Sequence, residues 1–370
     1  MKTPPKRIKN NFCFFLILII YFCYNHNRLT LIKNNLILAI ESSCDDTAAA
    51  VLNNRRVLSN CIHNQDTIHI PYGGIVPELA SRAHQSKITP IVNQALYEAN
   101  IDKKDLNAIA YTQGPGLLGS LLIGSSFAKS MSLALKIPII PINHMHGHIL
   151  AHFIENNNYE PPKFPFIGIT VSGGHTQILY VNDYFDMKII GNTLDDAIGE
   201  AFDKCGKRIG LSYPAGQQID ELAKTGDSKK FSFPISNLSG YNLSYSGVKT
   251  AFLNFIQNQE NKSPNFIKEN LNDICASLQY TLTRIILIKI EEIASDFNVN
   301  KIVIGGGVSA NSELRKQLKY LSSIKKWNLF LPPLEYTTDN AAMIGIAAYY
   351  KLKNKKFGEL TEISQPRIKE

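Results

Sequence analysis

The stretch "NHMHGHILAHF" (residues 143–153) places histidines at positions 144, 146, 148 and 152. On a helix, residues four apart share a face, so His144 and His148 can bind one metal ion. His146 would point about 200° away from His144 around the helix axis. His152 extends the face of the pair, but we expect it to be packed or solvent-facing rather than a ligand. The spacing therefore predicts a metal site that needs a third ligand.

The same spacing occurs in zinc proteases with the pattern HExxH, in which the glutamate is the general base. The three residues between His144 and His148 are Met-His-Gly, so this base is absent. His146 does not easily replace it, because it lies off the metal face. The sequence therefore argues against a metalloprotease.

The best third-ligand candidate by residue type is Asp339, in the turn Thr-Thr-Asp-Asn before the last predicted helix. Aspartate is also a favoured N-terminal cap of helices, which gives this residue a purely structural alternative. The sequence alone leaves both interpretations open.

Three turns of small residues are typical of phosphate handling, because small side chains let backbone N–H groups approach an anion. They are "SSCDDT" (42–47), "SGGHT" (172–176) and "GGGVSAN" (305–311). The last turn lies between a predicted strand and a predicted helix, whose N-terminus would add to anion binding. Each turn alone is weak, but together they predict a nucleotide cleft.

The pattern GxGxxG occurs as "GPGLLG", from Gly114 to Gly119. A dinucleotide-binding fold also requires an acidic residue about 20 positions later. The first acidic residue after Gly119 is Glu155, so we predict instead a tight turn with close helix packing.

Two predicted β-hairpins indicate an α/β fold with a duplicated unit. The first begins at residue 36 and carries Asp45 and Asp46 at its tip, and the second has strands at 166–171 and 177–181. Their separation of about 130 residues predicts two similar units that face each other across a cleft.

The chain has 370 residues, of which 44% are hydrophobic and 19% charged, so it is long enough for two cores. We predict an extension, two domains joined near the proline-rich segment 160–166, and a last helix with tail that packs back on the first domain. The boundaries are 1–35, 36–160, 161–335 and 336–370.

The formal charge of +8 is concentrated at the N-terminus. Residues 1–36 contain six lysine and arginine residues and no acidic residue, which leaves about +2 for the remainder. Any nucleic-acid surface must therefore be local. The six cysteines show no CxxC pattern, which argues against a disulfide framework or a thiolate zinc site.

The N-terminal segment contains the apolar run "NFCFFLILIIYFCYN". This run is shorter than a membrane span and close in length to a signal-peptide core, but no typical cleavage site follows it. A mispredicted start, a membrane tether and a cleaved presequence remain open.

Nine motifs in consistent order between about residues 36 and 350 resemble the tRNA N6-adenosine threonylcarbamoyltransferase family. The resemblance excludes residues 1–35. The motifs are "ESSCDDT", "YGGIVPELASRAH", "TQGPGLLGSLLIG", "NHMHGHI", "TVSGGHTQ", "DDAIGEAFDK", "SYSGVKTA", "GGGVSANSELR" and "YTTDNAAMIG".

The resemblance implies the two-domain architecture of actin, Hsp70 and sugar kinases, with RNase H-like units and an interdomain nucleotide cleft. It implies transfer from threonylcarbamoyl-AMP to N6 of adenosine 37 in the anticodon loop of tRNAs that read codons beginning with A. The implied partners are a paralogous subunit of the same fold and an ATPase subunit, with no stable membrane partner. The implied location is cytoplasmic, or organellar or membrane-tethered if the extension is real.

Carried over by position, the resemblance assigns one Fe²⁺ per subunit, or Zn²⁺, to His144, His148 and Asp339. It assigns substrate binding to a loop over the phosphate end, to residues that hold the nucleoside and to glycines beneath it. These are Thr170, Val171, Ser172, Gly173 and Gly174; Asp203, Gly216, Asp220 and Asn311; and Gly305, Gly306 and Gly307. Asp45, and less securely Asp46, match the acidic catalytic tip.

The expected mechanism has the metal polarise the carbonyl of the mixed anhydride while Asp45 positions the adenine amine or accepts its proton. Many members of the family that this chain resembles have glutamate or another residue in place of His146, which puts little in doubt because this position lies off the metal face. Two rivals remain. A small-molecule kinase would not need the histidine pair with Asp339, and a non-catalytic scaffold would lack the metal residues.

Overall fold

The computed structural model describes residues 34–156, 160–236 and 238–368, and residues Leu36–Glu370 form one compact unit. The hypotheses about the N-terminal extension concern residues that lie outside this part, apart from Asn34 and Asn35.

The first sheet has five strands in the order β3-β2-β1-β4-β5. β2 pairs antiparallel with β1 and β3, whereas β4 runs parallel to β1 and β5. Every residue of β1, "LILAIE", is buried, as expected for a strand that is covered on both faces. The strands are β1 (Leu36–Glu41), β2 (Thr47–Asn53), β3 (Arg56–His63), β4 (Ala108–Gly114) and β5 (Ile139–Asn143).

The second sheet repeats this topology, with the strand order β10-β9-β6-β7-β8. Its first three strands form an antiparallel meander, and β9 and β10 continue the sheet in parallel on the other side of β6. The prediction of an α/β fold with a duplicated unit is confirmed. The strands are β6 (Phe166–Val171), β7 (Thr176–Val181), β8 (Met187–Asn192), β9 (Lys301–Gly305) and β10 (Asn328–Phe330).

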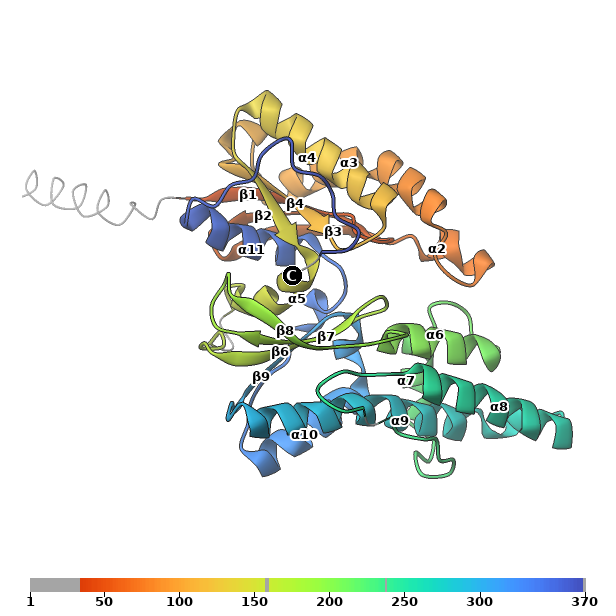
Figure 1. The fold of residues 1–370 in the computed structure, drawn as a ribbon. Coiled ribbons are helices and arrows are strands. Elements are labelled where there is room, and N and C mark those ends of the chain that lie inside the picture. The colour runs from red at the N-terminus through yellow and green to blue at the C-terminus, as the bar shows by residue number, and fades with distance from the viewer. Residues whose placement is uncertain (1–33, 157–159, 237, 369–370) are drawn as a thin grey trace, which may run out of the picture. The chain divides into compact units, whose positions relative to one another are not determined.

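Helices cover both faces of the first sheet. α3 (Pro77–Ala99) and α4 (Leu118–Leu135) share one apolar core with it, and α11 (Ala341–Lys353) packs against β1 and β2 from the other face (Figure 1). By length and composition, α4 is the one helix in the described part that is apolar enough to cross a membrane, and it packs against α3 and β4.

The second sheet shares its largest core with five helices that follow β8 or β9 in the chain. They are α6 (Ile198–Arg208), α7 (Gly216–Ala223), α8 (Ser246–Lys262), α9 (Phe266–Asp296) and α10 (Ser312–Lys325). The shorter helices are α2 (Asp66–His69) and the 3-10 turns Ile70–Tyr72, Lys103–Asp105, Ala151–Phe153, Gly307–Ala310 and Leu334–Tyr336.

The histidine helix α5 (His144–Leu150) lies between the two sheets (Figure 1). It contacts β4 and β5 of the first sheet, β6 and β9 of the second, and also α11. Its apolar side chains, including Ile149 and Leu150, belong to a core shared by both sheets. A side chain on this helix is therefore held from both halves of the molecule.

The "GPGLLG" motif forms a tight turn that leads into α4. The N–H of Leu117 donates to the carbonyl of Ser43 at 2.7 Å, and a Cβ on Gly119 would come within 2.2 Å of the Ser81 hydroxyl on α3. The predicted turn with close helix packing is thus present. The four cysteines in the described part, Cys44, Cys61, Cys205 and Cys275, are free thiols.

Candidate metal centre and active site

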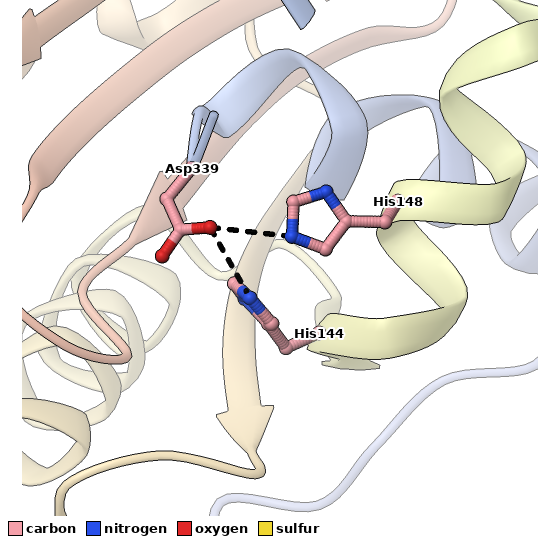
Figure 2. A group of neighbouring side chains, drawn as sticks. All are labelled: His144, His148 and Asp339. Atoms are coloured by element: carbon pink, nitrogen blue, oxygen red, sulfur yellow. Dashed lines mark ion pairs between the residues drawn. The ribbon is translucent and has the colours of Figure 1, made fainter. Parts of the chain in front are cut away.

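Two histidines of α5 and one aspartate that precedes α11 converge in the interior (Figure 2). The Nε2 atoms of His144 and His148 lie 3.4 and 3.2 Å from the same oxygen of Asp339, Oδ1. Both histidine side chains are nearly or fully buried, whereas Asp339 remains about a fifth exposed. The site is therefore open to solvent or substrate on the side of the carboxylate.

These donor atoms fit a first-row metal ion. Bonds of about 2.0 Å in a tetrahedral arrangement separate neighbouring ligand atoms by about 3.3 Å, close to the two observed separations. Nε2 of His148 is buried with Asp339 Oδ1 as its neighbour at 3.2 Å, so a metal ion bound by both groups would compensate for their burial. Two imidazoles and one carboxylate are a donor set suited to iron(II) or zinc.

The residue that follows Asp339 decides whether this aspartate caps α11 or faces the histidines. Asn340, not Asp339, is the N-cap of α11, and its side chain accepts the N–H of Met343 at 3.0 Å. The N-cap alternative for Asp339 is therefore wrong. Asn340 caps the N-terminus of α11, and the Asp339 carboxylate points at the two histidines.

The local sequence explains why α5 begins where it does. Asn143, the last residue of β5, is the N-cap, and its side chain accepts the N–H groups of Met145 and His146. His146 is not part of the metal-ligand group found among the described residues. His152 follows α5 in a 3-10 turn, where its Nε2 donates to the carbonyl of Ile304 at 2.7 Å.

Charge is distributed unequally over the two histidines. Burial alone would lower the pKa of His144, but the carboxylates of Glu41 and Asp339 raise it well above its usual range. Burial lowers the pKa of His148. The two histidines together outweigh burial and lower the pKa of Asp339, so this carboxylate is ionised.

The sequence analysis assigned no role to Glu41, the last residue of β1. Its buried carboxylate accepts the N–H of Ser43 at 2.5 Å and the hydroxyl of Thr112 at 2.6 Å. It also lies 3.0 Å from Nδ1 of His144, on the side of the ring opposite Asp339. The one pattern that could have pointed to it is a charged residue at the end of an otherwise apolar strand.

The predicted acidic residues lie at the half-buried tip of the β1–β2 hairpin. Burial and the nearby charge of Asp339 raise the pKa of Asp45 to about 6 and that of Asp46 to about 8. Asp46 also accepts a hydrogen bond from the side chain of Asn64 at 3.0 Å. At neutral pH, Asp45 is therefore mostly ionised and Asp46 mostly protonated.

A second residue that the sequence analysis missed, His84 of α3, supports this tip. Its Nδ1 lies 2.8 Å from the hydroxyl of Thr47, and its Nε2 lies 3.0 Å from the carbonyl of Cys44. These two partners flank Asp45 and Asp46, so one buried imidazole holds both ends of the acidic tip. Its position in the motif "ELASRAH" was the available hint.

The segment expected to cover the phosphate end is only partly a loop. Thr170 and Val171 are buried residues of β6, paired with β7, and only Ser172, Gly173 and Gly174 form the tip. The reason is that β-branched residues favour the pleated strand. The tip closes through the N–H of Ser172, which donates to the carbonyl of His175 at 2.9 Å.

The three glycines after β9 permit close backbone contacts. A Cβ on Gly305 would lie 2.7 Å from the carbonyl oxygen of His148, so β9 and the metal helix touch directly here. Gly306 has φ +90°, and a Cβ there would lie 2.4 Å from the carbonyl oxygen of Val171. Gly307 begins the following 3-10 turn.

The four residues expected to hold the nucleoside are connected through hydrogen bonds and chain neighbours. The carboxylate of Asp203 accepts the N–H of Ala215 at 2.8 Å, next to Gly216. Asp220 accepts the N–H and hydroxyl of Ser312, the residue after Asn311. Burial raises the pKa of Asp203.

The N-terminus of α10, which the sequence analysis expected to add to anion binding, is partly occupied by side chains. The Asn311 side chain accepts the N–H of Leu314 at 3.0 Å, and Asp220 accepts that of Ser312. Two of the first N–H groups of this helix are thus already occupied by side chains, and the contribution of the helix end to anion binding stays a prediction. The glycine backbone before it remains available.

A cavity of about 260 Å³ beside Asp203 is lined by residues of both halves. Ile70 to Gly73 come from the segment after α2, and Lys207 and Tyr213 come from the second half. A larger hollow of about 540 Å³, between β3 and residues 334–338, contains none of the candidate site residues.

The fold is similar to that of solved HypF structures. The full-length HypF crystallised in a phosphate- and nucleotide-bound form matches with a TM-score of 0.56 and 15% identity, over 89% of this chain and 48% of that chain. HypF from T. kodakarensis matches with a TM-score of 0.58 and 16% identity, over 87% and 48%. The chain thus has the two-unit α/β fold of the actin, Hsp70 and sugar-kinase class.

Sequence comparisons identify the family within this class. A family model described as tRNA N6-adenosine threonylcarbamoyltransferase matches residues 56–346. Proteins of that name from Christiangramia forsetii and Riemerella anatipestifer are 56% and 52% identical, each over 90% of this chain and 98% of the relative. The chain belongs to the tRNA N6-adenosine threonylcarbamoyltransferase family. The predicted resemblance is confirmed, and the family is a metal-dependent transferase.

Proposed function

We propose that this chain transfers the threonylcarbamoyl group from threonylcarbamoyl-AMP to N6 of adenosine 37 in tRNAs that read codons beginning with A. The observation that carries the proposal is the convergence of His144, His148 and Asp339 in a chain that matches its relatives along 98% of their length. A protease of the HExxH type has no support, because the tripeptide Met-His-Gly lacks the glutamate base and His146 lies off the metal face.

The donor end of the substrate is assigned to the second half of the molecule. Gly307 and the exposed glycines Gly173 and Gly174 have no side-chain bulk and would approach the phosphate, with Ser172 beside them and the buried Gly305 and Gly306 beneath the nucleoside. Asp203, Gly216, Asp220 and Asn311 would hold the nucleoside. The Asn311 amide accepts the N–H of Leu314 and donates to Gln279, which fixes its position and leaves one N–H for the nucleoside.

We assign one Fe²⁺ per subunit, or Zn²⁺, to His144, His148 and Asp339. Three protein ligands leave a position for substrate, as in catalytic rather than structural metal sites. When bound, such an ion supplies Lewis-acid polarisation of a carbonyl oxygen, worth several kcal/mol. The protein's own part is to hold the two imidazoles from one helix and the carboxylate from a distant turn.

Asp45 is the proposed proton acceptor. The N6 amine of adenine must form a bond to the carbamoyl carbon and lose one proton, while the bond to the phosphate oxygen breaks and AMP leaves. A carboxylate with a pKa of about 6 is ionised at neutral pH and close enough to the working pH to accept that proton. Asp46, with a pKa of about 8, is better suited to donate a hydrogen bond.

We further propose partner subunits of the same machinery, one of the same fold and one ATPase, because the net charge outside residues 1–36 is small for a protein that binds tRNA alone. The proposed location is cytoplasmic, or organellar or membrane-tethered if the extension is retained. The proposed domains are residues 36–160, 161–335 and the segment 336–370.

The test is a transfer reaction with the full chain, prepared anaerobically and mixed with threonylcarbamoyl-AMP, unmodified tRNA and partner subunits. Nucleoside mass spectrometry should detect threonylcarbamoyladenosine, and His144→Ala and Asp339→Ala should abolish the product and bound metal together. His146→Ala, on the same helix but outside the ligand group, should retain both.

Metal content and ATP turnover separate the alternatives. A chain that binds metal and adenylate yet forms no product with its partners would contradict the transferase. Metal-independent ATP-dependent phosphorylation of a small molecule would support a kinase. Stoichiometric partner binding with neither activity would support a scaffold.

A further inference from the structure

Glu41 is buried, charged and unassigned by the function proposed above. Its side chain is fully buried at the end of β1, and His144 is its ionic partner among the described residues. Removing a carboxylate from water costs several kcal/mol unless hydrogen bonds and an opposite charge compensate for it. Such a residue requires a reason beyond packing.

The contacts of Glu41 occupy both carboxylate oxygens. Oε1 accepts the backbone N–H of Ser43, and Oε2 accepts the hydroxyl of Thr112 at 2.6 Å. Oε2 also faces Nδ1 of His144 at 3.0 Å. The carboxylate is therefore held by hydrogen bonds from β4 and from the β1–β2 hairpin tip. These bonds fix the direction in which Oε2 faces His144.

The opposite nitrogen of the same ring faces the proposed metal position. Nε2 of His144 lies 3.4 Å from Asp339, on the side shared with His148. When Nδ1 carries the hydrogen that donates to a carboxylate, the lone pair of a neutral imidazole is on Nε2. Carboxylates in this position orient metal-binding histidines and raise their basicity.

We propose that Glu41 is a positioning residue that selects the Nδ1–H tautomer of His144 and directs Nε2 at the metal, with Thr112 holding the carboxylate in place. The proposal rests on the metal site assigned above. His148 differs, because its Nδ1 has no hydrogen-bond partner in the described structure. The tautomer of His144 should therefore be set by a neighbouring carboxylate, whereas that of His148 should not.

The test measures zinc binding by the full chain in competition with a chelator, together with the visible spectrum of the cobalt(II)-substituted protein. Glu41→Gln keeps the shape of the side chain and should weaken zinc binding by about 10- to 100-fold and change the cobalt spectrum. Thr112→Val should weaken it by about 2- to 10-fold, as expected for one hydrogen bond. Long-range ¹H–¹⁵N spectra of the zinc-loaded protein should show His144 bound through Nε2.

The matched control is Thr283→Val, which removes a buried threonine hydroxyl that donates to a backbone carbonyl in α9. It should lower the melting temperature without changing zinc affinity. A wild-type chain that binds no zinc would overturn the metal site itself and the inference with it. Wild-type binding with unchanged affinity and cobalt spectrum in Glu41→Gln would overturn the inference alone. If Glu41→Gln does not fold, an unchanged zinc affinity and cobalt spectrum in Thr112→Val would overturn the inference instead.

Discussion

The tips of the β1–β2 and β6–β7 hairpins occupy the same position in two units of the same topology, yet they have opposite chemistry. The first tip carries Asp45 and Asp46 and is braced from α3 by His84. The second has the exposed glycines Gly173 and Gly174 and closes on its own backbone. The two hairpin tips therefore correspond in topology but differ in side chains. The first tip presents carboxylates, and the second presents mainly backbone N–H groups.

The strands that follow in each unit differ in the same way. β4 ends at a glycine turn that the C-terminal segment covers, since a Cβ on Gly114 would lie 1.8 Å from the carbonyl oxygen of Gln365. β9 ends at Gly305 to Gly307, where a Cβ on Gly307 would meet only Thr338, at 4.0 Å. The glycine turn of the first unit is therefore covered at Gly114, whereas that of the second unit is packed at Gly305 and Gly306 and open at Gly307.

The strongest test of this difference is Asp45→Asn at the acidic tip. Loss of a general base should lower kcat for transfer by about 10²- to 10⁴-fold, with a small change in the KM for threonylcarbamoyl-AMP. Single-turnover transfer monitored by mass spectrometry measures both. Ser172→Ala on the other tip should instead raise the KM, and a matching loss of kcat in both variants would contradict the division of roles.

Gly306→Ala tests whether the second unit depends on its backbone. A φ of +90° and a Cβ position 2.4 Å from Val171 disfavour any side chain, so the free energy of unfolding should fall by about 3 kcal/mol. Urea unfolding measures this change. Gly174→Ala, where an added Cβ meets nothing within 4 Å, is the matched control and should leave stability nearly unchanged.

His152 tests the contact between the two units, because its ring donates to Ile304 of β9 from the segment after α5. Burial lowers its pKa from 6.5 to about 4, so it is neutral when folded. The stability that comes from keeping this ring neutral is fully present above pH 6.5. It is lost as the pH falls toward 4, and the total loss in the free energy of unfolding should be about 3 kcal/mol. His152→Gln should remove this part of the pH dependence of unfolding. Parallel curves for the two proteins would refute it.

His84→Ala should have the smallest effect. It removes two hydrogen bonds from the ends of the acidic tip, each worth about 1 kcal/mol, so we expect a loss of kcat of at most about 30-fold. His84→Gln, which can replace one bond, should recover part of it. If the affinity for threonylcarbamoyl-AMP fell by the same factor as kcat, His84 would support the whole cleft rather than the acidic tip alone.

The strands, both hairpins and the histidine pair could be predicted from the sequence, because apolar runs and four-residue spacing are local patterns. Local pattern named Asp339 as a candidate ligand but could not decide its role, which only the family resemblance assigned. Asp339 and its neighbour Asn340 are both good helix caps, and only the folded turn distinguishes them. The hydrogen bond from the first N–H of α10 to Asp220 could not be predicted either, because the two residues lie 92 positions apart in the sequence. Glu41 and His84 were missed for the same reason.

The last helix also constrains the order in which the chain can acquire its structure during synthesis. α11 begins at residue 341, yet it covers β1 and β2, which are made first. Until that helix leaves the ribosome, one apolar face of the first sheet has no cover and the metal site lacks Asp339. Because domains usually fold N-terminal part first, β1 and β2 should stay without this cover while the nearly 300 residues between β2 and α11 are synthesised, which makes the growing chain a client for chaperones.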